Sequence, residues 1–115
     1  MSLNIQKTIT VAQSAHFSDA IDLREVWLAR LFTPAALTAT TVIGFYASDD
    51  DVTYAPLKDQ YNALVQITVT LDAAGAYVLP SEVLGCNFIK IWTCTTAGVD
   101  VDQAAARTFK LSLKG

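Results

Sequence analysis

Charged side chains are scarce in this 115-residue sequence: they make up 17% of it, against 52% hydrophobic residues. Disordered segments combine low hydrophobicity with high net charge, so this composition excludes a disordered chain. With so few charges, a soluble monomer has difficulty covering its own surface. We therefore expect the protein to hide part of its surface against copies of itself or against a larger assembly.

Basic residues are few and scattered. Eight Lys and Arg stand against eleven Asp and Glu, which gives a formal net charge of −3 and a pI near 4.8. Binding to nucleic acid normally needs a basic stripe that displaces counterions from phosphate. Here the basic residues stand singly from Lys7 to Lys114, so we expect no direct nucleic-acid partner.

The sequence also lacks a long apolar run. Residues 1–7 have neither the charged start nor the continuous apolar stretch of a signal peptide. The longest uncharged stretch, residues 31–48, is short for a membrane span, contains Pro34 and is rich in threonine. We expect a protein that is made in the cytoplasm without a signal peptide and that has no membrane partner.

Residues suited to catalysis or metal binding are equally rare. On one extended strand, the Cα atoms of Cys86 and Cys94 lie about 26 Å apart, whereas a disulfide needs less than about 7 Å, so we expect both thiols to be reduced and buried. His16 is the single histidine and no nucleophile motif lies near it. The two glutamates, Glu25 and Glu82, form no recognisable acid pair. We expect a protein without enzymatic activity or cofactor.

Residues that favour strands are abundant: Val, Ile and Thr together account for 30 of the 115 positions. Alternation of apolar and polar residues, separated by turn residues, predicts strands. Their ranges are 5–11, 20–23, 26–32, 41–47, 52–57, 65–71, 76–79, 88–95 and 109–114. Residues 80–85 suit one helical turn, and residues 100–106 suit either a second turn or a loop.

This pattern predicts an all-β fold in a single domain, residues 1–115. We expect a β-sandwich of jelly-roll type with seven to eight antiparallel strands and at most one or two short helical turns. Residues 1–12 suit an N-terminal arm or an edge strand. Residues 26–32 and 41–47 are apolar on both faces of the expected strands, more than one thin sandwich buries alone, so we expect hidden surface there.

The densest charge cluster is Asp49, Asp50 and Asp51. Three carboxylates on a tight turn could supply part of a Ca²⁺ shell, which makes this stretch a possible ligand loop. Neighbouring side chains on an extended chain point in alternate directions, however, and the Asp-x-Asp-x-Asp spacing of a Ca²⁺ loop is absent. We favour a solvated hairpin turn, with Tyr54 as a partly exposed ring beside it.

The hairpin sequence FYASDDDVTYAPL (residues 45–57) resembles the "aromatic-x-Ser-x-Asp-Gly-x-Thr-aromatic" hairpin of discoidin-like, galactose-binding-like sandwiches. FIKI (residues 88–91) is similar to a later strand of that family, aromatic-Ile-Arg-Ile. This sequence departs from the family at the turn glycine, where Asp51 stands or no equivalent exists. It also departs at Asn87, where the family has arginine, and it lacks the terminal disulfide. The resemblance implies a jelly-roll sandwich.

Three further motifs resemble small structural proteins of tailed phages, in the same order along the chain. They are SDAIDL (residues 18–23), TPAALT (33–38) and VDQAAAR (101–107). This resemblance is closer than the first. It implies a virion component, of the head decoration (cement) type or of the head-fibre or spike type.

We therefore expect a non-enzymatic phage protein, made in the host cytoplasm, that decorates and stabilises the capsid surface. Its expected partners are the major capsid protein and further copies of itself, as a trimer or dimer. Terminal strands can add to a sheet edge of a partner, so the expected interface includes Leu3, Ile5, Ile9, Val11 and Tyr54. The alternative is a carbohydrate-binding module of a head fibre, spike or tail, which requires two or three exposed aromatic rings in one concave patch.

Overall fold

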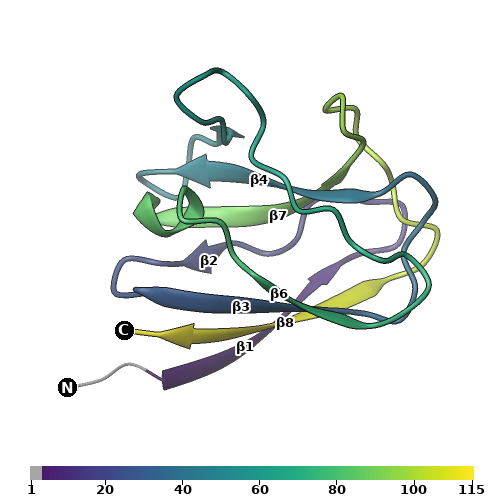
Figure 1. Ribbon diagram of the computed structural model, residues 1–115, viewed down its shortest axis with the longest axis horizontal. Helices are drawn as coiled ribbons and strands as arrows, with labels where there is room; N and C mark the ends of the chain where they lie inside the picture. The colour runs from purple at the N-terminus through teal and green to yellow at the C-terminus, as the bar shows by residue number, and fades with distance from the viewer. Residues whose placement is uncertain (1–3) are drawn as a thin grey trace.

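The alternating segments of the sequence form two four-stranded sheets in the computed structural model, which describes residues 4–115 (Figure 1). The only helical element among these residues is one short 3₁₀ turn, η1. The elements are β1 (Asn4–Val11), β2 (Ile21–Asp22), β3 (Leu28–Thr33), β4 (Val42–Ser48), β5 (Ala55–Pro56), β6 (Gly75–Val78), η1 (Val83–Gly85), β7 (Phe88–Cys94) and β8 (Arg107–Lys114).

We call the two layers sheet A, with strand order β1-β8-β3-β6, and sheet B, with strand order β2-β7-β4-β5. All pairings within both sheets are antiparallel. The chain changes sheet between successive strands, except where β4 pairs with β5. This order is that of an eight-stranded jelly roll built from two Greek keys. The predicted all-β sandwich is confirmed.

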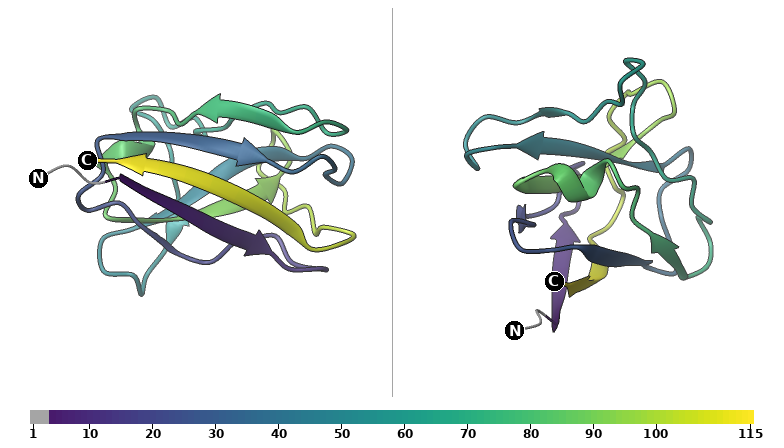
Figure 2. Two further views of the ribbon diagram at one scale, coloured as in Figure 1. Left: turned by 90° about the horizontal axis from the view of Figure 1, so that it is seen from below. Right: turned by 60° about the vertical axis from the view of Figure 1, so that its left-hand side comes forward.

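The core lies between the sheets, which are seen as separate layers in the right-hand view of Figure 2. Each strand sends every second side chain into it because successive residues of a strand point to opposite faces. In β3, for example, Ala29, Leu31 and Thr33 are buried while the residues between them are exposed. The largest fully buried hydrophobic side chains are Phe45, Phe109, Ile9, Ile21, Leu31, Ile43, Ile89, Ile91, Leu111, Val11 and Val83.

Two of the expected strands are largely absent. Residues 65–71 meet sheet B at one point, where Ile67 exchanges backbone hydrogen bonds of 2.8 and 3.0 Å with Ile43. Val65 and Val69 are still buried, so the alternation predicted the burial of this segment correctly but not its pairing. The strand expected over 52–57 shrinks to β5, because side-chain hydrogen bonds fold residues 48–53 into a turn.

Residues 80–85 contain η1, as expected, and residues 100–106 form a loop. Within residues 4–115 no helix is long and apolar enough to span a membrane.

Candidate interaction surface

The outer side of sheet A carries large hydrophobic side chains that nothing in the described chain covers. Leu28, Phe32 and Val78 are 58%, 41% and 65% exposed, and Trp27, just before β3, is 78% exposed. The left-hand view of Figure 2 looks onto this sheet, and no other segment lies in front of it. We call this surface the bare face; it comprises Leu28, Arg30, Phe32, Ala76, Val78, Lys110, Ser112 and Lys114.

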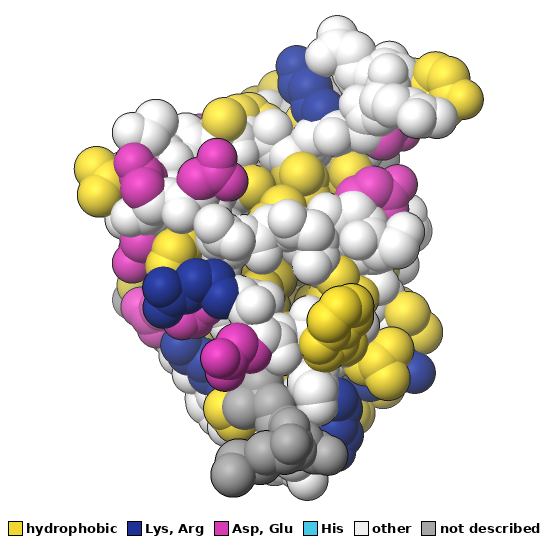
Figure 3. All heavy atoms as spheres, turned by 90° about the vertical axis from the view of Figure 1, so that its left-hand side faces the viewer, with side chains coloured by type: hydrophobic (Ala, Val, Ile, Leu, Met, Phe, Trp, Pro, Cys, Tyr) yellow, Lys and Arg dark blue, Asp and Glu magenta, His cyan; other side chains and the backbone are white. Residues whose placement is uncertain are grey.

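Strand register places these side chains in rows across the sheet. Arg30 pairs with Val78 on one side and with Ser112 on the other, and Phe32 pairs with Ala76 and Lys110 in the same way. A hollow of about 350 Å³ lies next to Phe32, lined also by Gln6, Thr8 and Lys110. Figure 3 shows hydrophobic side chains gathered beside Lys and Arg at the lower right, on the side of sheet A.

All charged side chains on the bare face are cations: Arg30, Lys110 and Lys114. Arg30 Nη1 donates to the Ala29 carbonyl at 3.2 Å, and Lys114 Nζ donates to Asn4 Oδ1 at 2.6 Å. Within residues 4–115, none of the three cations lies in an ion pair with a carboxylate. The bare face is therefore positive, although the whole chain is acidic.

The outer side of sheet B is covered instead. Trp92 on β7 is only 3% exposed although it points away from the core between the sheets. It packs edge to face against Tyr46, with ring centroids 5.0 Å apart, and Tyr46 packs in the same way against Phe17 at 4.6 Å. The Trp92 indole nitrogen donates to Asp100 Oδ1 at 2.9 Å. Connecting segments thus form a second, smaller apolar cluster over sheet B.

The predicted interface residues of β1 fall mostly inside the protein. Ile9 and Val11 are 1% and 0% exposed in the core, so their side chains do not contact another molecule in this fold. The prediction is corrected for these two residues because β1 pairs along its whole length with β8 and contributes to the core. Ile5 is 45% exposed, and Leu3 lies outside the described residues.

Tyr54, the remaining predicted interface residue, is half-buried beside the aspartate turn. Its hydroxyl donates to Asp51, and Lys90 Nζ lies 4.5 Å from the centre of its ring. Burial raises the pKa of Tyr54 to about 12, and the hydrogen bond to Asp51 adds to this rise. The ring is therefore fixed by contacts within its own chain.

The aspartate turn uses its polar groups internally. Asp50 Oδ1 accepts the backbone N–H groups of Val52 and Thr53 at 2.9 and 3.0 Å. These backbone hydrogen bonds, with that of Thr53 the largest cause, lower the pKa of Asp50. Residues 4–115 contain no group of three His, Cys, Asp or Glu side chains placed to hold a metal ion. The geometry favours the hairpin-turn interpretation of Asp49, Asp50 and Asp51 over the ligand loop.

One polar cluster gave no signal in the sequence. His16 Nδ1 lies 2.8 Å from Asp102 Oδ1, and His16 Nε2 lies 3.3 Å from Asp100 Oδ2. The residues are more than eighty positions apart in sequence, so only the fold brings them together. The cluster ties the connection between β1 and β2 to the loop that covers Trp92.

The two cysteines are free and differ in environment. Cys94 is fully buried beneath the cover of sheet B, and burial raises its pKa to about 11. Cys86 is only partly buried, so the expectation of two buried thiols holds for one of them.

Comparisons with known proteins bear on the fold alone. No family model matches the chain, and neither does any curated protein sequence. Among solved structures, the crystal structure of the SPBc2 prophage-derived protein YomS is similar, with a TM-score of 0.55 and 12% sequence identity. The match covers 98% of this chain and 96% of that one. The chain is thus similar over nearly its whole length to the fold of a prophage-derived protein.

Proposed function

We propose that this protein is a non-enzymatic structural component of a phage virion that decorates the capsid. The observation that carries the proposal is the bare face of sheet A, where Leu28, Phe32 and Val78 stand exposed on a regular sheet and the exposed Trp27 precedes β3. Exposed apolar surface on that scale is typical of an interaction site. The bare face would then contact the major capsid protein.

Two further observations support a phage origin. The fold is similar to that of a prophage-derived protein, and the three motifs at residues 18–23, 33–38 and 101–107 resemble tailed-phage structural proteins. The galactose-binding-like resemblance agrees with the jelly-roll strand order, and the Asp50 carboxylate is held by hydrogen bonds within its own turn.

The apolar side chains of the bare face suit a weak contact that is repeated on a lattice. Fully burying a Leu, Phe or Val side chain stabilises a complex by about 1.5–3 kcal/mol, and Leu28, Phe32 and Val78 are each roughly half exposed before binding. Together they contribute about 3–5 kcal/mol, against an association cost of about 4–15 kcal/mol. One contact alone is marginal, whereas several linked copies gain avidity.

Self-association as a dimer or trimer is part of this proposal, and β1 is the strand best suited to it. The other three edge strands have two, two and four residues, while β1 offers eight, without proline and with one charge, Lys7. Long free edges are templates for pairing. Light scattering at rising concentration tests this: wild type should form a defined oligomer, and Thr8→Glu, which adds a carboxylate to the shared edge in every copy, should remain monomeric.

The experiment for the function is co-sedimentation with empty heads assembled from the major capsid protein of the source phage. Wild type should sediment with the heads at a saturating, fixed stoichiometry. The double variant Leu28→Ser/Val78→Ser should bind at least tenfold more weakly while keeping its β circular-dichroism signal. Absence of wild-type binding, or full binding by the double variant, would contradict the proposal.

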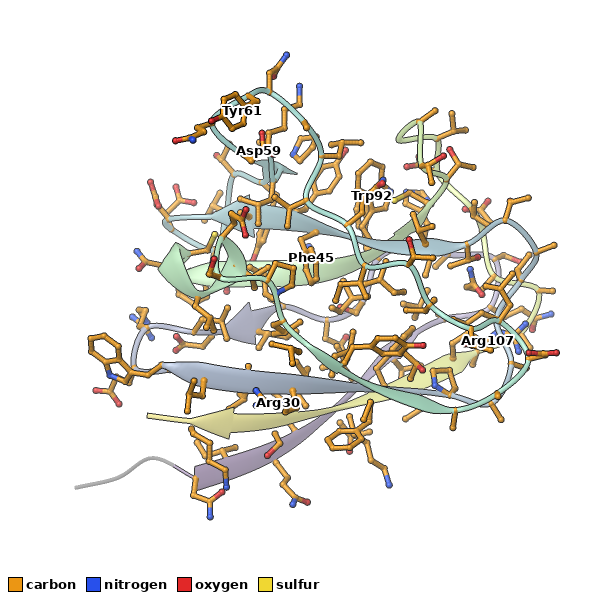
Figure 4. All side chains as sticks on the ribbon, in the orientation of Figure 1. Arg30, Phe45, Asp59, Tyr61, Trp92 and Arg107 are labelled. Carbon is orange, nitrogen blue, oxygen red and sulfur yellow. The ribbon has the colours of Figure 1, made fainter. Side chains whose placement is uncertain are left out.

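The carbohydrate-binding alternative receives less support because the exposed aromatic rings lie apart. Trp27 and Phe32 are five residues apart, about 17 Å along an extended strand. Tyr61 is at the tip of a loop at the top of Figure 4, whereas Arg30 of the bare face is near the bottom. A glycan array provides the test; specific binding lost on Tyr61→Ala would favour the alternative.

A further inference from the structure

We infer that the partner of the bare face is an acidic protein surface: an apolar patch that carries carboxylates. This inference rests on the proposed docking role of the bare face, but not on the partner being a capsid. Its first basis is the uneven distribution of charged side chains between the bare face and the rest of the molecule. Three of the eight Lys and Arg lie on the bare face, and all eleven Asp and Glu lie elsewhere with the other five cations.

Among the described residues, the cations of the bare face are not paired with carboxylates of their own chain, whereas Arg24 is, and Lys90 is also engaged. Arg24 forms a bidentate pair with Asp22, with nitrogen–oxygen distances of 2.7 and 3.0 Å, and Lys90 lies over the Tyr54 ring. Arg30, Lys110 and Lys114 contact only neutral oxygens or none in the described chain. Their charge is thus available to a second molecule.

A second copy docked face to face is disfavoured by the same charges. A two-fold contact places the same patch on both sides. Arg30, Lys110 and Lys114 of one copy would then meet the same cations of the other, and no carboxylate on this face would separate them. Like charges brought together at an interface cost several kcal/mol. The bare face is therefore complementary to a different, negative surface.

A polyanion such as nucleic acid is disfavoured by the surroundings of the patch. Three cations on a sheet neutralise few phosphates, which leaves binding weak at physiological salt. A long polyanion would also run beyond the patch onto a surface on which all eleven carboxylates lie. A bounded acidic patch on a folded protein avoids this repulsion.

The apolar residues define the rest of the partner. Leu28 and Phe32 alternate with Arg30 along β3, so apolar and cationic side chains are interleaved rather than separated. Arginine stems also pack on apolar surface while the guanidinium reaches a carboxylate. A matching surface presents carboxylates between apolar side chains at strand-like spacing.

The test uses a defined chemical probe, a chromatography support whose ligand carries both a carboxylate and a phenyl ring. At pH 7.5 and low salt, wild type should be retained despite its net negative charge. Lys110→Glu should elute at half the salt concentration or less, and Arg30→Glu/Lys110→Glu should pass unretained. The matched control, Lys58→Glu, makes the same charge change at an exposed lysine away from the bare face and should elute like wild type.

Four readouts separate the outcomes. Leu28→Ser should weaken retention without changing charge, and equal retention of this variant would contradict the interleaved apolar contribution. Unretained wild type, or equal losses for Lys58→Glu and Lys110→Glu, would overturn the inference. So would binding of a fluorescent 20-nucleotide single strand that Lys110→Glu abolishes, because the partner would then be nucleic acid. Failure to bind empty heads, with the expected retention pattern intact, would refute the capsid role alone.

Discussion

The two sheets are alike on their inner sides and opposite on their outer sides. In sheet B, Phe17 and Leu64 from the connections pack with Tyr46 of β4 against Trp92, Val42 and Cys94. In sheet A, β3 leaves Leu28 and Phe32 exposed in the middle of the sheet. Both faces carry large apolar side chains, and they differ in whether connecting segments cover them. One outer face is packed and buried, and the other is left exposed.

The two tryptophans provide the strongest test of this difference. Trp92→Ala removes a large buried side chain and should lower the free energy of unfolding by about 3–5 kcal/mol. Trp27→Ala, at a side chain 78% exposed, should change it by less than about 0.5 kcal/mol. Urea denaturation followed by circular dichroism measures both. Trp92→Phe keeps an aromatic ring and provides a folded intermediate case if Trp92→Ala does not fold. Equal changes in the free energy of unfolding at positions 27 and 92 would contradict the difference between the two outer faces.

Gly44 tests how tightly the covered face is packed. A Cβ at this position would lie 2.8 Å from Trp92 Cε3 and 2.9 Å from Cys94 Sγ, and both side chains are buried. Gly44→Ala should therefore destabilise the protein by about 1–3 kcal/mol through overpacking. Gly85→Ala is the control, because nothing lies within 4 Å of its Cβ position. Matching thermal midpoints for the two variants would argue against close packing under Trp92.

Substitution of Asp100 tests the hydrogen bond between its carboxylate and the Trp92 indole, which links the loop at residues 95–106 to sheet B. Asp100→Ala leaves the indole N–H of Trp92 without its acceptor and should cost about 1–2 kcal/mol. Asp102→Ala removes a carboxylate that is 61% exposed and contacts only the His16 ring. An exposed contact of that kind should contribute less than about 0.5 kcal/mol. Chemical denaturation of both variants separates them, and a larger loss for Asp102→Ala would assign the link to His16 instead.

The reactivity of the two cysteine thiols tests how tightly the connecting segments cover sheet B, and this measurement needs no substitution. At pH 8, Cys94 should resist a disulfide reagent because its sulfur is buried and burial raises its pKa to about 11. Cys86, partly exposed, should react, and its rate should still increase above pH 9 because burial raises its pKa as well. We expect one fast thiol per native chain and two in urea. Two fast thiols in the native protein would show that the cover opens readily.

Much of the fold follows from local patterns. The alternation in residues 5–11 and 109–114 predicted two strands that the structure pairs with each other. Residues 65–71 alternate just as cleanly, yet they form a single bridge to β4. Alternation of apolar and polar residues indicates that one side of an extended segment is buried and the other exposed. An extended segment that covers a sheet without pairing has this property just as a strand does. Pairing depends on distant residues, so the sequence pattern did not distinguish the two.

The interaction surface was only partly predictable. The apolar run at 26–32 indicated hidden surface, and the structure places Leu28 and Phe32 on the bare face. The run at 41–47 looked equivalent, but its outer residues lie beneath Trp92 and its neighbours. The sequence did not group the three cations, because Arg30 comes near Lys110 and Lys114 only when β8 lies beside β3. Long-range register, rather than composition, creates the face.

The position of β8 has a consequence for synthesis. β8 lies between β1 and β3, so these two early strands have no contact through the sheet until residues 107–114 have left the ribosome. The pairing of β1 with β8 joins residues far apart in sequence, and such pairings form slowly. Until it forms, β1 remains unpaired. The bare face is thus absent from any nascent chain from which residues 107–114 have not emerged, and it forms only once β8 lies beside β3.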